Sequence, residues 1–129
     1  MTLSPLSIQN AVAPHNSTES FRDFAVNELA AAPPWTVGIC FNPSCGREFR
    51  PGRDWQIYCG ASCAAAGKAE MRKWGHKMAL PLLIHRMGKY DRTNLAVMDL
   101  TRAARRFTTQ TQSAWLEDRK ARSLMGGRS

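Results

Sequence analysis

The sequence predicts a small α+β fold, in which a cysteine-rich β-hairpin leads into one α-helix and two or three further α-helices follow. Three observations support this prediction. The chain has 129 residues, enough for one small core but not for two independent ones. Its four cysteines lie in two close pairs between positions 40 and 63, among glycines and aromatic residues. Beyond position 63, Ala, Lys, Glu, Met and Arg dominate, and these residues favour helices.

Composition divides the chain into four segments. Residues 1–34 are rich in Ser, Thr, Asn, Pro and Ala, which predicts a flexible N-terminal arm. Residues 35–78 contain the cysteines, residues 79–122 are expected to form helices that pack on them, and residues 123–129 form a basic tail. Within the arm, Ser20 is suited to cap a short helix.

The stretch between Cys45 and Cys59 predicts the β-hairpin. Pro51 and Gly52 suit the two central positions of a type II turn, because Pro presets the first φ and Gly tolerates the positive second one. Good strand formers flank this turn on both sides, namely Phe49, Trp55, Ile57 and Tyr58.

Helical segments follow the second cysteine pair. Residues 64–77 predict one helix, which Pro81 is expected to end or kink unless it opens the next helix. Residues 82–90 predict a short apolar helix. Asp91 or Thr93 can cap a longer helix that reaches about position 122. Spacings of three and four give that helix one apolar stripe, made of Val97, Leu100, Ala104, Phe107, Thr111 and Ala114.

The formal net charge is +8 and is unevenly distributed. Residues 1–34 hold one basic and three acidic residues, whereas the remainder holds 17 basic and 7 acidic residues. Such a domain favours polyanions, although a solvated basic face would have the same composition. The sequence has no apolar run of about 20 residues and no secretory signal pattern, so we expect a cytoplasmic protein without a membrane partner.

In a reducing compartment, two close cysteine pairs indicate a metal site more than disulfides. The spacing is C-x4-C, then thirteen residues, then C-x3-C. Four thiolates suit one tetrahedral Zn²⁺ and leave no open position for water or substrate, so the predicted zinc is structural. The alternative is four independent buried thiols. The predicted ligands are Cys40, Cys45, Cys59 and Cys63.

Residues 40–63 resemble the treble-clef zinc fingers of small bacterial and phage proteins. The matching elements are Cys45-Gly46, Phe49-Arg50-Pro51, Gln56-Ile57-Tyr58-Cys59 and Cys63. The first pair is also similar to the knuckle of CGNR-type zinc fingers, found in bacterial transcription regulators. The chain departs from that group, because residues 64–66 are alanines where a Gly-Asn-Arg signature would stand. The resemblance implies a zinc-bound treble clef, built from a knuckle, a β-hairpin and a helix.

The leading functional hypothesis is a nucleic-acid-binding protein of the regulatory or phage accessory type, with double-stranded DNA as the ligand. The helix after Cys63 would be the reading element. The alternative for its cations is a solvated face opposite buried Met71, Trp74 and Met78. The predicted nucleic-acid contacts are Arg47, Arg50, Arg53, Trp55, Lys68, Arg72, Lys73 and Lys77.

The sequence leaves two other function classes to consider, a protein-interaction adaptor and an enzyme. A protein-interaction adaptor would use the C-terminal helix, where Trp115, Leu116 and Leu124 could remain exposed without a partner. Against it, the stripe of that helix could pack on residues 82–87 of the same chain. An enzyme would need histidines and a polar partner around an open cation. His76 and His85 have no carboxylate cluster nearby in the sequence, so we expect no catalytic activity.

Overall fold

The computed structural model describes residues 18–31, 34–53 and 56–126. Its helical elements are α2 (Phe21–Phe24), the π-helix η1 (Ala25–Leu29), α3 (Ala61–Gly88) and α4 (Leu95–Gly126). The chain divides into two compact units. The first, which we call the N-terminal unit, comprises residues up to Val37 together with Pro51–Gln56. The second, which we call the main unit, comprises Gly38–Arg50 and the chain from Ile57 onward.

The predicted α+β class is wrong, because helices account for 65% of the structure and the described residues contain no β-strand. The described backbone pairing is one isolated antiparallel bridge between Ile39 and Glu48. The expected hairpin is absent because the backbone N–H groups of its residues donate elsewhere. The Phe49 N–H bonds the Gly38 carbonyl at 2.8 Å, and the Gln56 N–H bonds the Arg53 carbonyl at 3.2 Å, so neither pairs across the expected hairpin.

The chain instead folds back around the first cysteine pair. Gly38 and Gly46 adopt φ values of 87° and 65°, which side chains disfavour, and they make this reversal possible. At the expected turn, the Gly52 N–H bonds the side-chain oxygen of Gln56 at 2.8 Å. Trp55, one of the expected strand residues, lies outside the described residues. The treble clef is therefore not the architecture, since a knuckle and a helix are present without the β-hairpin between them.

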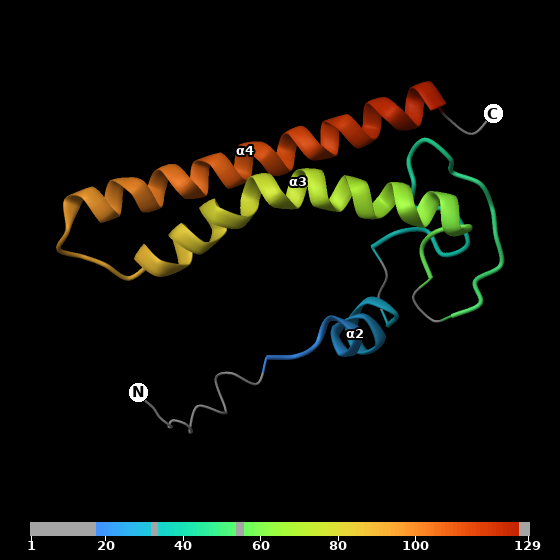
Figure 1. The fold of residues 1–129 in the computed structure, drawn as a ribbon, viewed down its shortest axis with the longest axis horizontal. Coiled ribbons are helices and arrows are strands. Elements are labelled where there is room, and N and C mark those ends of the chain that lie inside the picture. The colour runs from blue at the N-terminus through green and yellow to red at the C-terminus, as the bar shows by residue number, and fades with distance from the viewer. Residues whose placement is uncertain (1–17, 32–33, 54–55, 127–129) are drawn as a thin grey trace. The chain divides into compact units, whose positions relative to one another are not determined.

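Helix α3 continues through Pro81 and does not end there. The expected helix at 64–77 and the apolar helix at 82–90 are therefore one element, which bends in its yellow half in Figure 1. Proline removes one intrahelical hydrogen bond and usually breaks a helix. Packing against α4 offsets that loss, because Met78 and Gly88 are buried on either side of Pro81.

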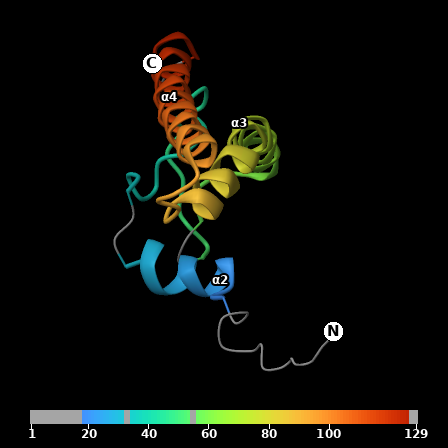
Figure 2. The same cartoon turned by 90° about the vertical axis from the view of Figure 1, so that its left-hand side faces the viewer.

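Helices α3 and α4 lie side by side in antiparallel orientation, as Figures 1 and 2 show. We call their contact the hairpin seam. In α4 its residues alternate spacings of four and three, as in a coiled coil. Three of the residues predicted for the apolar stripe, Leu100, Phe107 and Ala114, are exposed and do not belong to this seam. The seam residues of α4 are Val97, Thr101, Ala104, Thr108, Thr111 and Trp115.

Two close approaches fix how the main unit packs. The ring centroids of Trp74 and Trp115 lie 5.9 Å apart with nearly parallel planes. At the loop end, Gly88 has no side chain, and a Cβ there would lie 2.1 Å from the Thr101 hydroxyl oxygen. A glycine is therefore required where α3 meets α4 near the connecting loop.

Side chains cap the helix starts. Ser20 accepts a hydrogen bond from the Asp23 N–H at 3.0 Å, which confirms the expected cap of the N-terminal helix. In α4 the cap is Asn94, whose side-chain oxygen accepts from the Val97 N–H at 3.2 Å. Asp91 shapes the preceding turn by accepting from the backbone N–H of Thr93 and of Asn94. Among the described helices, none combines the length and apolar character that crossing a bilayer requires.

Candidate metal centre

The sulfur atoms of all four cysteines lie within 4.8 Å of one another. The Sγ of Cys59 is 3.9 Å from that of Cys45 and 3.8 Å from that of Cys63. Cys40 and Cys45 come from the knuckle, Cys59 lies just before Gly60, the N-cap residue of α3, and Cys63 lies in the first turn of that helix. The predicted clustering of the cysteines is confirmed, and this group could hold a metal ion.

Three N–H groups donate to these sulfur atoms. The Asn42 side-chain amide donates to Cys63 at 3.3 Å, and the backbone N–H of Cys59 donates to Cys40 at 3.4 Å. The backbone N–H of Arg47 donates to Cys45, also at 3.4 Å. Such bonds orient thiolates and stabilise their negative charge when a cation is bound. Asn42 was not among the residues that the sequence singled out.

The acidity of the thiols differs across the cluster. Burial raises the pKa of Cys40, and burial with hydrogen bonds from neighbouring thiols raises the pKa of Cys59 to about 12. The Arg47 N–H lowers the pKa of Cys45. Four thiolates this close repel one another, so their joint deprotonation needs a cation among them. The cluster therefore fits a bound metal ion better than four free thiolates.

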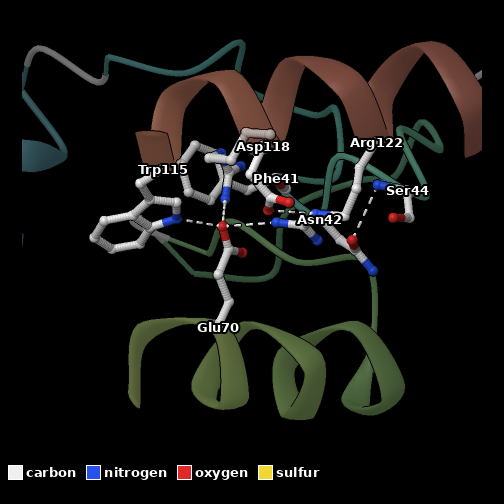
Figure 3. A network of polar contacts seen from close by, with 8 residues as sticks. Phe41, Asn42, Ser44, Glu70, Trp115, Asp118 and Arg122 are labelled. Carbon is white, nitrogen blue, oxygen red and sulfur yellow. Dashed lines mark hydrogen bonds and ion pairs between the residues drawn. The ribbon is translucent and has the colours of Figure 1, made fainter. Parts of the chain in front are cut away.

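A buried ionic network links the knuckle to both long helices. Arg119 of α4 pairs with Glu70 of α3 at 2.6 Å and also donates to the backbone carbonyl of Phe41, the residue after Cys40. Arg122 and the Trp115 indole N–H bond the same Glu70 oxygen, at 2.9 and 2.6 Å. Figure 3 shows Glu70 reaching from α3 toward these partners.

Sequence reasoning missed this network and considered Trp115 only as an apolar residue that could remain exposed without a partner. A signal was present. Glu70 is the only acidic residue between positions 54 and 91, on an otherwise basic helix. Trp115, Arg119 and Arg122 follow one another at spacings of four and three, which places them on one face of α4. An isolated acid facing such a row indicates a buried pair.

The structure divides the predicted nucleic-acid contacts. Lys68 and Arg72 are exposed on α3 at a spacing of four. Lys73 and Lys77 share a different face, with their ammonium nitrogens 5.2 and 4.7 Å from the ring of Trp74. Lys73 therefore lies with Lys77, on a different face from Lys68 and Arg72.

The loop candidates divide as well. Arg47 and Arg50 are exposed in the main unit, and Arg53 is exposed in the N-terminal unit. Trp55 lies outside the described residues. The eight predicted residues are therefore not shown to form one surface, and the α3 cations are the best-defined group among them.

Comparison with known proteins adds no relative. No protein-family model matches the chain, and neither curated proteins nor solved structures give a match. The function must therefore be argued from the chemistry of the main unit. Two features of that unit matter most, namely a closed cluster of four sulfurs and an excess of positive charge on the helices.

Proposed function

We propose that this chain is a nucleic-acid-binding protein of the accessory or regulatory kind, stabilised by one structural Zn²⁺. Zinc is the metal that four cysteine sulfurs favour. A tetrahedron with Zn–S bonds of about 2.3 Å has S···S edges of about 3.8 Å. The separations from Cys59 to Cys45 and Cys63, 3.9 and 3.8 Å, fit those edges. With four ligands the shell is complete, so the metal would stabilise the fold and would not act on a substrate.

The observation that carries the proposed function is the uncompensated positive charge of α3 and α4. Residues 57–126 contain thirteen Lys and Arg against five Asp and Glu. Each acidic side chain is already engaged. Glu70, Asp99, Glu117 and Asp118 form ion pairs within the helices, and Asp91 accepts hydrogen bonds in the turn before α4. Within the described residues, the remaining cations of α3 and α4 form no ion pair.

The α3 cations are the strongest candidates for phosphate contacts. Within the part of the chain that the structure describes, Lys68, Arg72, Lys73 and Lys77 form no ion pair, and all four are exposed. Lys73 and Lys77 pack against Trp74, which orders their side chains while their charges face solvent. A polyphosphate backbone would offset this charge and release its own counterions.

Duplex DNA is the ligand that this helix fits best. A regular helix with cations one turn apart can follow phosphates along a groove, and phosphate contacts position a protein without fixing a sequence. We therefore propose binding to double-stranded DNA with weak sequence preference from α3 itself.

The test is a fluorescence-anisotropy titration of labelled random duplex DNA with the zinc-loaded chain, at low and near-physiological salt. Single-stranded RNA of the same length is titrated in parallel. We expect tighter binding to the duplex and an affinity that falls steeply as salt rises. No binding at low salt by protein that holds one zinc per chain would overturn the proposal. Preference for the RNA would reject duplex DNA as the ligand.

A pair of double variants locates the site. Lys68→Ala with Arg72→Ala should lower the slope of log affinity against log salt by about two, since each phosphate contact contributes about one. The control is Arg102→Ala with Lys120→Ala, which removes the same charge from exposed residues already paired with Asp99 and Glu117. If both variants lose the same affinity for DNA, the binding depends only on net charge, and α3 is rejected as the site.

A further inference from the structure

One side of the α3–α4 hairpin carries a row of cations on each helix, and we call this side the basic face. On α3 its positions directly follow the buried seam residues, at alternating spacings of four and three, so they lie beside one another along the helix. On α4 they follow the seam residues in the same way. The cations of the basic face are Lys68, Arg72, Arg86 and Lys89 from the α3 row and Arg102 and Arg105 from the α4 row.

A depression between the two helices shows that the two rows share one side of the seam near the connecting loop. Its volume is about 170 Å³. Arg86 and Lys89 follow two of its lining residues, Leu82 and His85, by four positions, so both cations lie beside it. The depression is lined by Leu82 and His85 of α3 and by Arg105, Thr108 and Thr109 of α4.

The opposite side of the hairpin has a different charge. A second depression, of about 270 Å³, marks that side near the cysteine cluster, and its lining includes Lys73 of α3 and Asp118 of α4. Lys77, four positions after Lys73, lies on the same side and also contacts the ring of Trp74. Two cations and an acidic residue therefore occur there, whereas neither row of the basic face contains an acidic residue.

Most of the cations on the basic face remain available to a ligand. Within the described residues, Lys68, Arg72, Arg86, Lys89 and Arg105 are all exposed and form no ion pair. The exception is Arg102, which is paired with Asp99 at 2.5 Å and is therefore already partly neutralised. Five like charges without acidic partners repel one another, and a polyanion would relieve that repulsion.

These cations form two groups along the hairpin. Lys68 and Arg72 lie toward the cysteine end, whereas Arg86, Lys89 and Arg105 lie around the depression at the loop end. Arg72 and Arg86 are 14 positions apart, or about 21 Å along the helix. Phosphates of one DNA strand follow one another at about 3.4 Å along the duplex axis, so a duplex of about six base pairs reaches both groups.

We infer that duplex DNA contacts the whole basic face, so that α4 shares the binding site and a second group of phosphate contacts lies at the loop end. The inference rests on the DNA binding proposed above and locates it. Of the α3 cations considered there, Lys68 and Arg72 belong to this face. Lys73 and Lys77 lie on the other side of the seam and should contribute less.

The chemistry of the loop-end group suits a phosphate. Arg105 and Thr109 both line the depression, and a guanidinium and a hydroxyl can donate to oxygens of the same phosphate. Between the two groups, the α3 row consists of Gly75, Ala79 and Leu82. Because Gly75 and Ala79 have no long side chain, the duplex can approach the helix backbone there while the cations at both ends reach its phosphates.

The test titrates labelled random duplex DNA with the full zinc-loaded chain at a series of salt concentrations. Arg86→Ala with Arg105→Ala should lower the slope of log affinity against log salt by about two, since two phosphate contacts are lost. The matched control is Lys73→Ala with Lys77→Ala, which removes two exposed, unpaired cations from the other side. Its slope should fall by less than about one. Helix content by circular dichroism and zinc content verify folding.

Each outcome decides the inference. Equal slopes for the two double variants overturn it, because the side of the hairpin then makes no difference. Loss of binding in the Lys68→Ala, Arg72→Ala protein without any loss in Arg86→Ala, Arg105→Ala overturns the inference alone and leaves the proposed function standing. A wild-type protein that does not bind DNA overturns both. Arg86→Ala with Lys89→Ala tests the same group should the first variant fail to fold.

Discussion

The guanidinium carbon of Arg119 lies 3.9 Å from the centre of the Phe41 ring, and the same side chain donates to the Phe41 carbonyl. The far end of α4 is therefore attached to the residue that follows the first cysteine. Through its ion pair with Glu70, Arg119 also holds α3 in the same place. One side chain thus joins the three parts of the main unit, and its loss should affect both the helices and the metal cluster.

Arg119→Ala should lower the free energy of unfolding by about 2–4 kcal/mol, because it leaves buried Glu70 with fewer partners and the Phe41 carbonyl without this donor. Urea unfolding of the zinc-loaded protein measures the change. Lys120→Ala is the control, since its pair with Glu117 is exposed and should contribute little. Equal stability of the two variants would show that the network does not hold the unit together.

Glu70 should make stability depend on pH. Burial alone would raise the pKa of Glu70, but hydrogen bonds from Trp115 and Arg119, with the charges of Arg119 and Arg122, lower it below the ordinary value of 4.5. A carboxylate with a lowered folded pKa contributes stability above its unfolded pKa and loses it as the pH falls through the folded one. The loss should therefore begin below about pH 4.5.

Glu70→Gln isolates this contribution from the protonation of the cysteines, which both proteins share. The difference in unfolding free energy between wild type and variant should be constant near neutral pH and shrink as the pH falls below about 4.5. Chemical denaturation at a series of pH values measures it. A difference that stays constant down to about pH 3 would contradict a lowered Glu70 pKa.

Cys45→Ser should abolish metal binding and the cooperative thermal transition of the main unit, because a structural metal supplies folding free energy that the knuckle lacks by itself. Metal content by mass spectrometry and a thermal scan read out both effects. Ser62→Ala, between the second pair of cysteines, is the matched control and should retain one metal per chain. Normal metal content and melting of Cys45→Ser would exclude this cluster as the stabilising site.

Two glycine substitutions in α3 should act in opposite directions. A Cβ at Gly67 would lie 2.1 Å from the Tyr58 hydroxyl oxygen, so Gly67→Ala should destabilise by about 1–3 kcal/mol. A Cβ at Gly75 meets nothing within 4 Å, so Gly75→Ala should stabilise the helix by up to about 1 kcal/mol. Thermal or urea unfolding distinguishes them. A Gly67→Ala protein as stable as Gly75→Ala would mean that Tyr58 does not pack against this part of α3.

The sequence alone was enough to anticipate the cysteine cluster and the Ser20 cap. Both depend on residues close together in the chain, where spacing and local hydrogen bonding decide the structure. The long helix α4 was also expected, but its cap is Asn94 and not Asp91 or Thr93. Of the alternatives considered for Pro81, an end of the helix is wrong, whereas α3 does bend in its second half (Figure 1). The local rule for proline competes with packing against α4, which depends on a partner 20 or more residues away.

The expected β-hairpin failed for a related reason. The type II turn expected at Pro51 and Gly52 is wrong, because Gly52 does not adopt the positive φ that this turn requires. The Phe49 N–H bonds the carbonyl of Gly38, which precedes the first cysteine. The predicted apolar stripe of α4 also combined residues that face α3 with residues that do not. Val97 lies in the seam and Leu100 is exposed, yet the two are only three positions apart and both are apolar. Which α4 residues face α3 depends on where α3 lies, and the spacing of apolar residues in the sequence does not give that position.

The contacts at the two ends of the α3–α4 hairpin together set its length. Glu70 meets Arg119 at one end, and Gly88 meets Thr101 at the other. Positions 70 and 88 are 18 apart, and so are positions 101 and 119. The two contacts are therefore separated by the same number of residues in both helices, and this equality keeps the helices in register. The threonines and alanines between the ends need only fit between the two backbones. Inserting or deleting a residue in one helix would misalign one end, whereas equal changes of seven residues in both would preserve both contacts.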